Sequence, residues 1–338
     1  MTENRLAKFP ERFFLFYEIM LIFIAICTLL GNALVLIVTW RERSLHQPNK
    51  YFIVFLAVAD LIVGVLVIPF KLYQLNLDPE QKNSISIHLC RFLVWIDTFA
   101  LTTSIYTLTF ISVDRYLKIS KPLQYKSRMT TSRSVKIIFL IVFISSSIAT
   151  YAATPFAGSS GILDGGVGPC SVNDLNEIKG FYTLLSIIAF MLPTICIIIM
   201  YVLIFLVVHK RQKMFLNGEL GQINNPSRQA VFRQDLKVIK MLLVVVGVFI
   251  CCWCPRIITI VLSIYHPTLL YVSNNSSLST IHGIYILFYT MRALPLLNSM
   301  CNPIIYACLD QTYRKAFIRV FHQIIRRPDV RRQQSPIA

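Results

Sequence analysis

LVWIDTFALTTSIYTLTFISVDRY, residues 93–116, is an apolar stretch in which Asp97 is the only charge before Asp114 and Arg115. A run of about 20 apolar residues is long enough to cross the roughly 30 Å hydrocarbon core of a membrane as a helix. Charged side chains inside such a span are costly and usually carry a function. The stretch therefore predicts a membrane-spanning helix with Asp97 near one end and Arg115 at the other.

Six further apolar windows of similar length occur along the chain. With the first, they lie at about 14–39, 50–73, 91–113, 135–155, 181–208, 238–264 and 283–308. The composition agrees, because hydrophobic residues make up 55% of the chain, charged residues only 14%, and the mean hydropathy is +0.62. Since a chain in lipid must satisfy its backbone hydrogen bonds internally, we predict an all-α membrane protein, a seven-transmembrane helix bundle.

The net charge of +17 is concentrated in alternate connections between the windows and in the tail. Of the 33 Lys and Arg residues, 24 lie in 40–50, 115–136, 209–240 and 311–338. Basic residues favour the cytosolic side of a membrane, so we expect the N-terminus outside and the C-terminus in the cytoplasm. This distribution favours contact with anionic membrane lipid rather than with nucleic acid.

Two cysteines, Cys90 and Cys170, fall at predicted outer positions, where an oxidising exterior favours a disulfide between them. The other seven lie in apolar windows, where cysteine mostly behaves as a small apolar residue. The sequence NNSS in a further outer loop offers Asn274 and Asn275 as overlapping glycosylation acceptors. Both features agree with the predicted topology.

Polar residues at membrane depth form two sets. One surrounds Asp60 and either holds a small hard cation or forms a hydrogen-bonded network around a protonated carboxyl group. Its other members are Asn32, Ser104, Asn298, Ser299 and Asn302. In the second set, at the inner face, Arg115 either pairs with Asp114, Asp235 or both as a latch or extends to the lipid headgroups.

Together these residues resemble the rhodopsin-like (class A) G protein-coupled receptors. The resemblance rests on motifs in the expected order: GN at 31–32, LAVAD at 56–60, Cys90 with Cys170, DRY at 114–116, Pro193 with Tyr201, CWCP at 252–255 and NPIIY at 302–306.

The resemblance implies one receptor domain over residues 1–322, with a short amphipathic eighth helix near 310–321, and a disordered cytoplasmic tail over 323–338. It implies a plasma-membrane protein in which an extracellular agonist favours a form that binds a heterotrimeric G protein. No nucleophile–base set or metal-ligand spacing occurs in the sequence, so an enzyme is not expected.

The family pattern also implies roles for individual residues. An allosteric sodium ion, the only cofactor or metal expected, would be bound by Asp60, Ser104, Asn298 and Asn302. The residues that switch between inactive and active forms would be Asp114, Arg115, Tyr201, Asp235, Phe249, Trp253 and Tyr306.

Asp97 matches the aspartate that binds the ligand's ammonium group in biogenic-amine receptors, a favourable pairing in a low-dielectric pocket. Arg256 and Arg292 depart from that pattern, because amine receptors place aromatic residues around the cation there. A biogenic-amine-like ligand and a neuropeptide or zwitterionic ligand bound by Asp97 with both arginines therefore remain alternatives, as does a structural pair of Asp97 with either arginine. The other expected ligand contacts are Leu101, Ser186, Phe190, Trp253, Ile257 and Leu296.

Two other membrane functions are weighed against the receptor. A transporter would also use charges inside the membrane, but the seven windows show no inverted repeat. A retinal-binding photoreceptor needs a lysine in the last window, which has none; Leu296 occupies the matching position. Both observations favour a receptor for a diffusible ligand.

Overall fold

The computed structural model describes residues 2–42, 45, 50–77, 86–154, 180, 183–216, 226–266 and 278–325. In this part of the chain all regular structure is helical, and no strand occurs. The predicted all-α fold is therefore confirmed.

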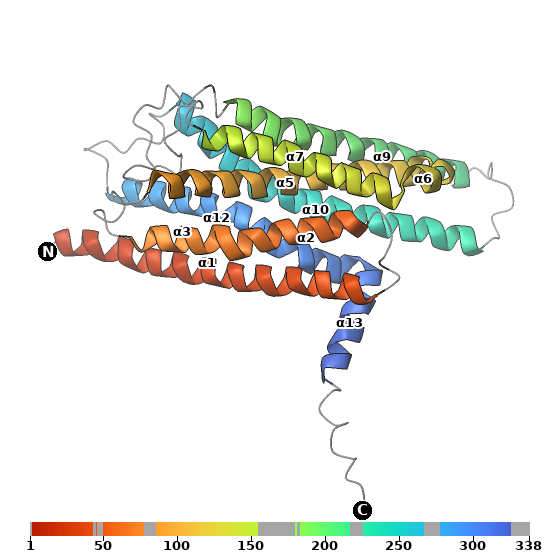
Figure 1. Ribbon diagram of the computed structural model, residues 1–338, viewed down its shortest axis with the longest axis horizontal. Helices are drawn as coiled ribbons and strands as arrows, with labels where there is room; N and C mark the ends of the chain where they lie inside the picture. The colour runs from red at the N-terminus through yellow and green to blue at the C-terminus, as the bar shows by residue number, and fades with distance from the viewer. Residues whose placement is uncertain are drawn as a thin grey trace, which may run out of the picture.

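Long helices lie side by side in a bundle, and one shorter helix, α13, leaves the end of the bundle across their direction (Figure 1). The long helices are α1 (Thr2–Arg41), α5 (Ile87–Ser120), α7 (Thr131–Ala153), α9 (Leu192–Leu216), α10 (Pro226–Tyr265) and α12 (Leu278–Leu309). The second predicted window is a rod of three segments, α2 (Lys50–Ile62), η2 (Val63–Val67) and α3 (Ile68–Leu75). The remaining elements are η4 (Ser186–Met191), α6 (Pro122–Arg128) and α13 (Gln311–Ile325).

Six helices in the described part are long and apolar enough to cross a membrane, one fewer than the seven predicted windows. They cover Glu11–Arg41, Lys50–Leu75, Ile87–Ser120, Thr131–Ala153, Thr183–Arg211 and Leu243–Leu262. The seventh window forms α12, which is 32 residues long. Arg292, Asn298 and Asn302 lower the hydropathy of α12, and both asparagines are buried inside the bundle. The polarity of α12 therefore faces protein rather than lipid.

The long helices turn large apolar side chains outward. Exposed examples on α1, α7 and α9 are Phe16, Leu30, Phe139, Phe143 and Phe205. Water would penalise such a surface, whereas lipid accommodates it, and the helices satisfy their own backbone hydrogen bonds. The interior is centred on α5, which packs against α2, α7 and α9.

Two of the rods contain a π-helical turn that ends two residues before a proline. The π turn η2 precedes Pro69, and η4 precedes Pro193. A proline ring clashes with the carbonyl group four residues earlier, and a π turn relieves this by adding one residue to the turn. Each π turn also rotates the helix that follows it, so it changes which side chains face the interior.

The close packing of α1 on α12 gives a stability prediction. A Cβ atom at Gly31 would lie 3.0 Å from both Cβ and Cγ of Pro303, whose ring cannot rotate away. Gly31→Ala should therefore lower the free energy of unfolding by about 1–3 kcal/mol. The measurement is the Tm of the detergent-purified protein.

Gly247 on α10 provides the matched control for Gly31→Ala. A Cβ atom at Gly247 would meet nothing within 4 Å. Gly247→Ala should therefore leave the stability unchanged or raise it by up to about 1 kcal/mol, as expected for alanine inside a helix. Equal Tm values for the two variants would contradict the packing argument.

The amphipathic helix predicted near 310–321 is α13. Its inner face buries Tyr313, Ala316 and Val320, while Arg314 and Arg319 are exposed. The helix continues to Ile325, so the predicted boundary at residue 322 falls inside it. Residues 326–338 lie outside the described part of the chain.

Asp310 joins α13 to the bundle. Its Oδ1 accepts hydrogen bonds from the backbone N–H groups of Thr312 at 2.9 Å and Tyr313 at 3.3 Å, which caps the helix. Its Oδ2 lies 2.7 Å from Nζ of Lys50 on α2. The same Nζ lies 4.6 Å from the centre of the Tyr313 ring. One buried cluster therefore ties α13 to the start of the second rod.

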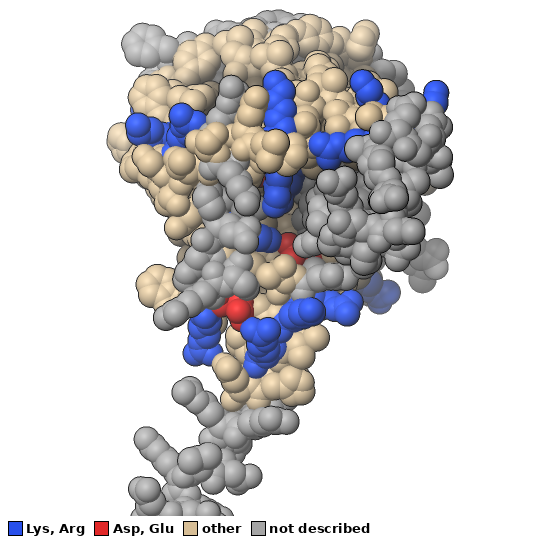
Figure 2. Space-filling view, turned by 90° about the vertical axis from the view of Figure 1, so that its right-hand side faces the viewer, with Lys and Arg blue, Asp and Glu red and all other residues tan. Residues whose placement is uncertain are grey.

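The end of the bundle that carries Arg115, here called the Arg115 end, is basic. Figure 2 shows Lys and Arg side chains spread over this end, with few Asp or Glu among the residues drawn in colour. Contributors in the last turns of their helices are Arg41 on α1, Lys118 on α5 and Lys213 on α9. The opposite end is called the Asp97 end.

Candidate functional site

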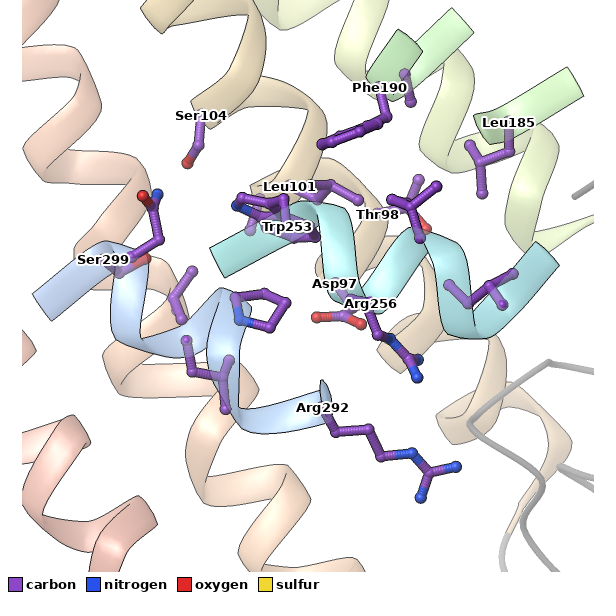
Figure 3. Close-up of a pocket in the computed structure, with 18 of the residues that line it drawn as sticks. Asp97, Thr98, Leu101, Ser104, Leu185, Phe190, Trp253, Arg256, Arg292 and Ser299 are labelled. Atoms are coloured by element: carbon purple, nitrogen blue, oxygen red, sulfur yellow. The ribbon is translucent and has the colours of Figure 1, made fainter. Parts of the chain in front are cut away.

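A cavity of about 140 Å³ lies in the Asp97 half of the bundle, between α3, α5, η4, α10 and α12 (Figure 3). All nine residues expected to bind a ligand line it: Asp97, Leu101, Ser186, Phe190, Trp253, Arg256, Ile257, Arg292 and Leu296. Figure 3 shows the charged side chains toward one end of the cavity and Ser104 and Ser299 toward the other. The structure thus brings the predicted set together around one space.

Helical spacing explains why these residues share a cavity. Residues four apart lie on one face of an α-helix. Three such pairs face the cavity: Asp97 with Leu101 on α5, Trp253 with Ile257 on α10, and Arg292 with Leu296 on α12. Each helix therefore contributes one stripe to the lining.

Asp97 pairs with a residue that the sequence analysis missed. Its Oδ2 lies 3.6 Å from Nζ of Lys71 on α3. The Asp97 side chain is 48% exposed and the Lys71 side chain 19% exposed. Lys71 lies inside the predicted window at 50–73, just after the π turn η2 and Pro69, which mark a change of helix face.

The two arginines considered as partners of Asp97 line the same cavity. The Arg292 guanidinium lies 5.9 Å from the Phe288 ring centre and 5.6 Å from the Tyr289 ring centre, within cation–π range. Among the described residues, the ion pair of Asp97 is with Lys71. The structure therefore does not support the hypothesis that Arg256 or Arg292 forms an ion pair with Asp97.

Asp60 is fully buried between α2 and α12. Its Oδ2 accepts a hydrogen bond of 2.8 Å from Asn302, while its Oδ1 has no hydrogen-bond partner in the described part of the chain. Asn32 donates to the backbone oxygens of Thr28 and Ser299. A buried carboxylate oxygen without a partner is costly, and either a cation or a proton relieves that cost.

Two other members of the expected sodium site, Ser104 and Asn298, line the deep end of the ligand cavity, as does Ser299. The fourth member, Asn302, contacts Asp60 directly. Hydroxyl, amide and carboxylate oxygens are the ligands that a hard cation prefers. The residues present therefore suit a small cation beside Asp60. No cluster of three or more His, Cys, Asp or Glu that would hold another metal occurs among the residues described.

An aromatic stack runs from the cavity into the core. The Phe190 and Phe249 ring centres are 5.9 Å apart, and those of Phe249 and Trp253 are 6.3 Å apart. Phe249 is fully buried, whereas Phe190 and Trp253 line the cavity. A ligand that displaces either lining ring therefore moves a residue packed against the core. Tyr201 and Tyr306 are buried in the same core cluster as Phe190 and Phe249.

At the Arg115 end, both Asp114 and Arg115 are buried. Asp114 Oδ1 accepts a hydrogen bond of 2.7 Å from the hydroxyl of Tyr125 on α6, a contact that the sequence analysis missed. Burial raises the pKa of the Tyr125 phenol above its usual value, and the adjacent Asp114 acts in the same direction. Tyr125 therefore remains a hydrogen-bond donor at neutral pH. Asp235 lies on α10, but its side chain is outside the described part.

The expected outer modifications fall mostly outside the described residues. Cys90 is disulfide-bonded, but its expected partner, Cys170, lies in an undescribed segment. Asn274 and Asn275 also lie outside. The seven cysteines of the apolar windows are free thiols, as expected.

Comparison with known proteins gives consistent matches over most of the chain. Residues 31–306 match the model of a family described as 7 transmembrane receptor (rhodopsin family). The chain is 28% identical over 309 residues to human (Homo sapiens) trace amine-associated receptor 1, covering 88% of this chain and 84% of that one. It is 29% identical over 315 residues to trace amine-associated receptor 4 of Mus musculus, covering 90% and 84%. It is 27% identical over 326 residues to human adenosine receptor A2a, covering 93% and 72%.

Proposed function

The chain belongs to the rhodopsin family of seven-transmembrane receptors, and from this premise we propose that its cavity binds the ammonium group of a small extracellular ligand at Asp97. The protein is a multi-pass plasma-membrane receptor that acts through a G protein, and it is not an enzyme.

One observation carries the amine proposal. The Asp97 carboxylate is about half exposed, at 48%, and lines a cavity whose other walls include Leu101, Phe190 and Trp253. A ligand that fills the cavity covers this carboxylate, and a charge pair shielded from water in this way is stronger than one in bulk solvent. Two of the relatives above are named for trace amines, which supports this choice, and one is named for adenosine.

A zwitterionic small molecule is the second candidate. Among the described lining residues, three cations, Lys71, Arg256 and Arg292, face the single carboxylate of Asp97. A ligand that carries an anionic group as well as its ammonium adds no net positive charge to this cavity. A neuropeptide fits less well, since the cavity of about 140 Å³ is small even beside the roughly 300–1,000 Å³ of usual small-molecule pockets.

A sodium ion beside Asp60 completes the proposed ligand set. Asp60, Ser104, Asn298 and Asn302 would hold it, and the unpartnered Asp60 Oδ1 supports its presence. A bound cation there neutralises the buried carboxylate and stabilises the packing of α2 on α12. A protonated Asp60 in a closed hydrogen-bonded network is the alternative.

Signalling would pass along α5 and α10 to the Arg115 end. The stack of Phe190, Phe249 and Trp253 couples the cavity to the core, and Arg115 lies in the same helix as Asp97. We place the Arg115 end in the cytosol, where basic residues are favoured, and the Asp97 end outside. Movement of α10, which carries Asp235, relative to Arg115 on α5 would then open the surface that receives the G protein.

The experiment is nucleotide exchange in membranes from cells that express the full chain with a G protein. Tyramine, tyrosine and adenosine serve as probes, because tyrosine is tyramine with an added carboxylate. We expect tyramine to stimulate exchange of GTP. Stimulation by tyrosine alone would favour the zwitterionic ligand, and stimulation by adenosine alone would overturn the role of Asp97. Uptake of a probe into sealed vesicles without exchange would instead indicate a transporter.

A further inference from the structure

The ion pair of Lys71 and Asp97 lies where the proposed ligand's ammonium would bind. Lys71 Nζ is 3.6 Å from Asp97 Oδ2, and both residues line the main cavity. Lys71 carries the same functional group, an ammonium, as the proposed ligand. The Lys71 side chain is only 19% exposed, so its charge is held inside the bundle rather than in bulk solvent.

The same two residues also line a second, much smaller cavity of about 10 Å³ between α3 and α5. Its other walls include Phe70, Gln74 and Leu93. The ion pair therefore forms part of the wall between the two cavities. A space of this size holds about one water-sized group, and an ammonium group is of that size.

We propose that Lys71 is a tethered ammonium that occupies Asp97 in the ligand-free receptor, and that the ligand's ammonium binds by taking its place. This inference rests on the proposed function. During this replacement Asp97 keeps a cationic partner throughout, so its carboxylate is never left unpaired in the cavity. The displaced Lys71 ammonium moves into the smaller cavity, where the amide oxygen of Gln74 accepts its hydrogen bond.

Because the ligand's ammonium must replace the Lys71 ammonium at Asp97, Lys71 is a determinant of ligand affinity. A tethered group competes at a high effective concentration without entering from solution. Every amine ligand must therefore displace Lys71 at a cost equal to the strength of the pair. Because Asp97 is half exposed, that strength is modest, and the ligand's own contacts with the cavity exceed it.

The first test needs no ligand. The Tm of the purified full-length receptor is measured for Lys71→Met, Asp97→Asn and the double variant. If Lys71 holds Asp97, the double variant loses less stability than the sum of the single variants, because each single change leaves the other charge unpaired. Additive losses would show that the two groups do not interact, and the proposal would fail.

The second test measures tyramine potency in the nucleotide-exchange assay. Lys71→Met should raise potency roughly fivefold, the value of a partly exposed ion pair. Gln74→Met should lower potency in the receptor with Lys71 and have no effect in the Lys71→Met background. The matched control is Arg91→Met. Arg91 lies at the end of α5 that carries Asp97 but does not line either cavity, so this change removes a positive charge without altering the ion pair.

The outcomes separate this inference from the proposed function. If the wild-type receptor responds to tyramine but Lys71→Met leaves the potency unchanged or lowers it, the Lys71–Asp97 pair is structural. That result would overturn the displacement of Lys71 by the ligand and leave the proposed function standing. If Arg91→Met raised tyramine potency as much as Lys71→Met, the cause would be net charge, and the displacement of Lys71 would also be overturned. Failure of both tyramine and tyrosine to stimulate any variant would overturn the proposed function, and the displacement of Lys71 with it.

Discussion

Asp97→Asn is expected to abolish the response to tyramine while leaving the receptor at the cell surface. Asparagine keeps the size of the side chain but removes the charge that the ammonium group pairs with. The bound ligand covers Asp97, and losing one partner of a charge pair shielded from water costs about 2–5 kcal/mol, which corresponds to a loss of potency of about thirtyfold to several thousandfold. The measurement is a concentration–response curve of nucleotide exchange, normalised to surface expression.

Glu11→Gln is the matched control for this prediction. Glu11 is exposed on α1 near the Asp97 end, so its replacement removes a negative charge without touching the cavity. We expect unchanged tyramine potency. A normal response of Asp97→Asn would mean that the ligand does not use this carboxylate. An Asp97→Asn receptor retained inside the cell would mean that the pair with Lys71 is required for folding.

The second large effect is expected at the Lys50–Asp310 pair. The two side chains are only 10% and 13% exposed, and their charged atoms lie 2.7 Å apart. Asp310→Asn keeps a side chain that can cap α13 but leaves the Lys50 ammonium buried without a carboxylate. Breaking one partner of a buried pair costs about 3–5 kcal/mol, so a large fall in Tm of the purified receptor should follow.

An exposed ion pair on the same helix provides the control. Arg319 on α13 pairs with Glu42 at 2.8 Å, but its side chain is 63% exposed. Arg319→Gln should therefore cost no more than about 1 kcal/mol. The double variant Lys50→Met with Asp310→Asn should recover much of the stability lost by Asp310→Asn. If Asp310→Asn and Arg319→Gln lowered the Tm equally, burial would not explain how much each ion pair contributes to stability.

The ionisation of Asp310 determines how the contribution of the Lys50–Asp310 pair to stability depends on pH. Burial opposes its ionisation, but the Lys50 ammonium and the N–H groups of Tyr313 and Thr312 outweigh burial, so the pKa of Asp310 lies below its usual 3.8. A carboxyl group with a lowered pKa contributes its full stability above the unfolded value, and that stability is lost as the pH falls through the folded value. Around neutral pH the carboxylate's contribution is therefore constant.

The elements of the fold were largely predictable, because each depends on local sequence. Apolar run length predicted the long helices, and the amphipathic pattern after residue 310 predicted α13. The seventh window forms α12 as predicted, although its polar residues make it less apolar than the other spans. Helix α13 extends three residues beyond residue 322.

The candidate site was predictable as a set but not in its pairing. Positions four residues apart on α5, α10 and α12 share a helix face, so the motifs placed all nine ligand-contact candidates around one cavity. Three contacts were missed: Lys71 with Asp97, Tyr125 with Asp114 and Lys50 with Asp310. Each joins two different elements, and no spacing along one helix reports such a contact.

By itself, the sequence determined that the chain forms long membrane helices, that one of them carries a carboxylate near one end and Arg115 near the other, and that basic residues gather at the Arg115 end. Only the tertiary structure decided that Lys71, rather than Arg256 or Arg292, forms the ion pair with Asp97. That choice depends on how each helix is rotated about its axis, and one extra residue in a π turn rotates the remainder of the helix by about 100°. The π turn before Pro69 lies ahead of Lys71, so the partner of Asp97 depends on a backbone feature that residue spacing does not reveal.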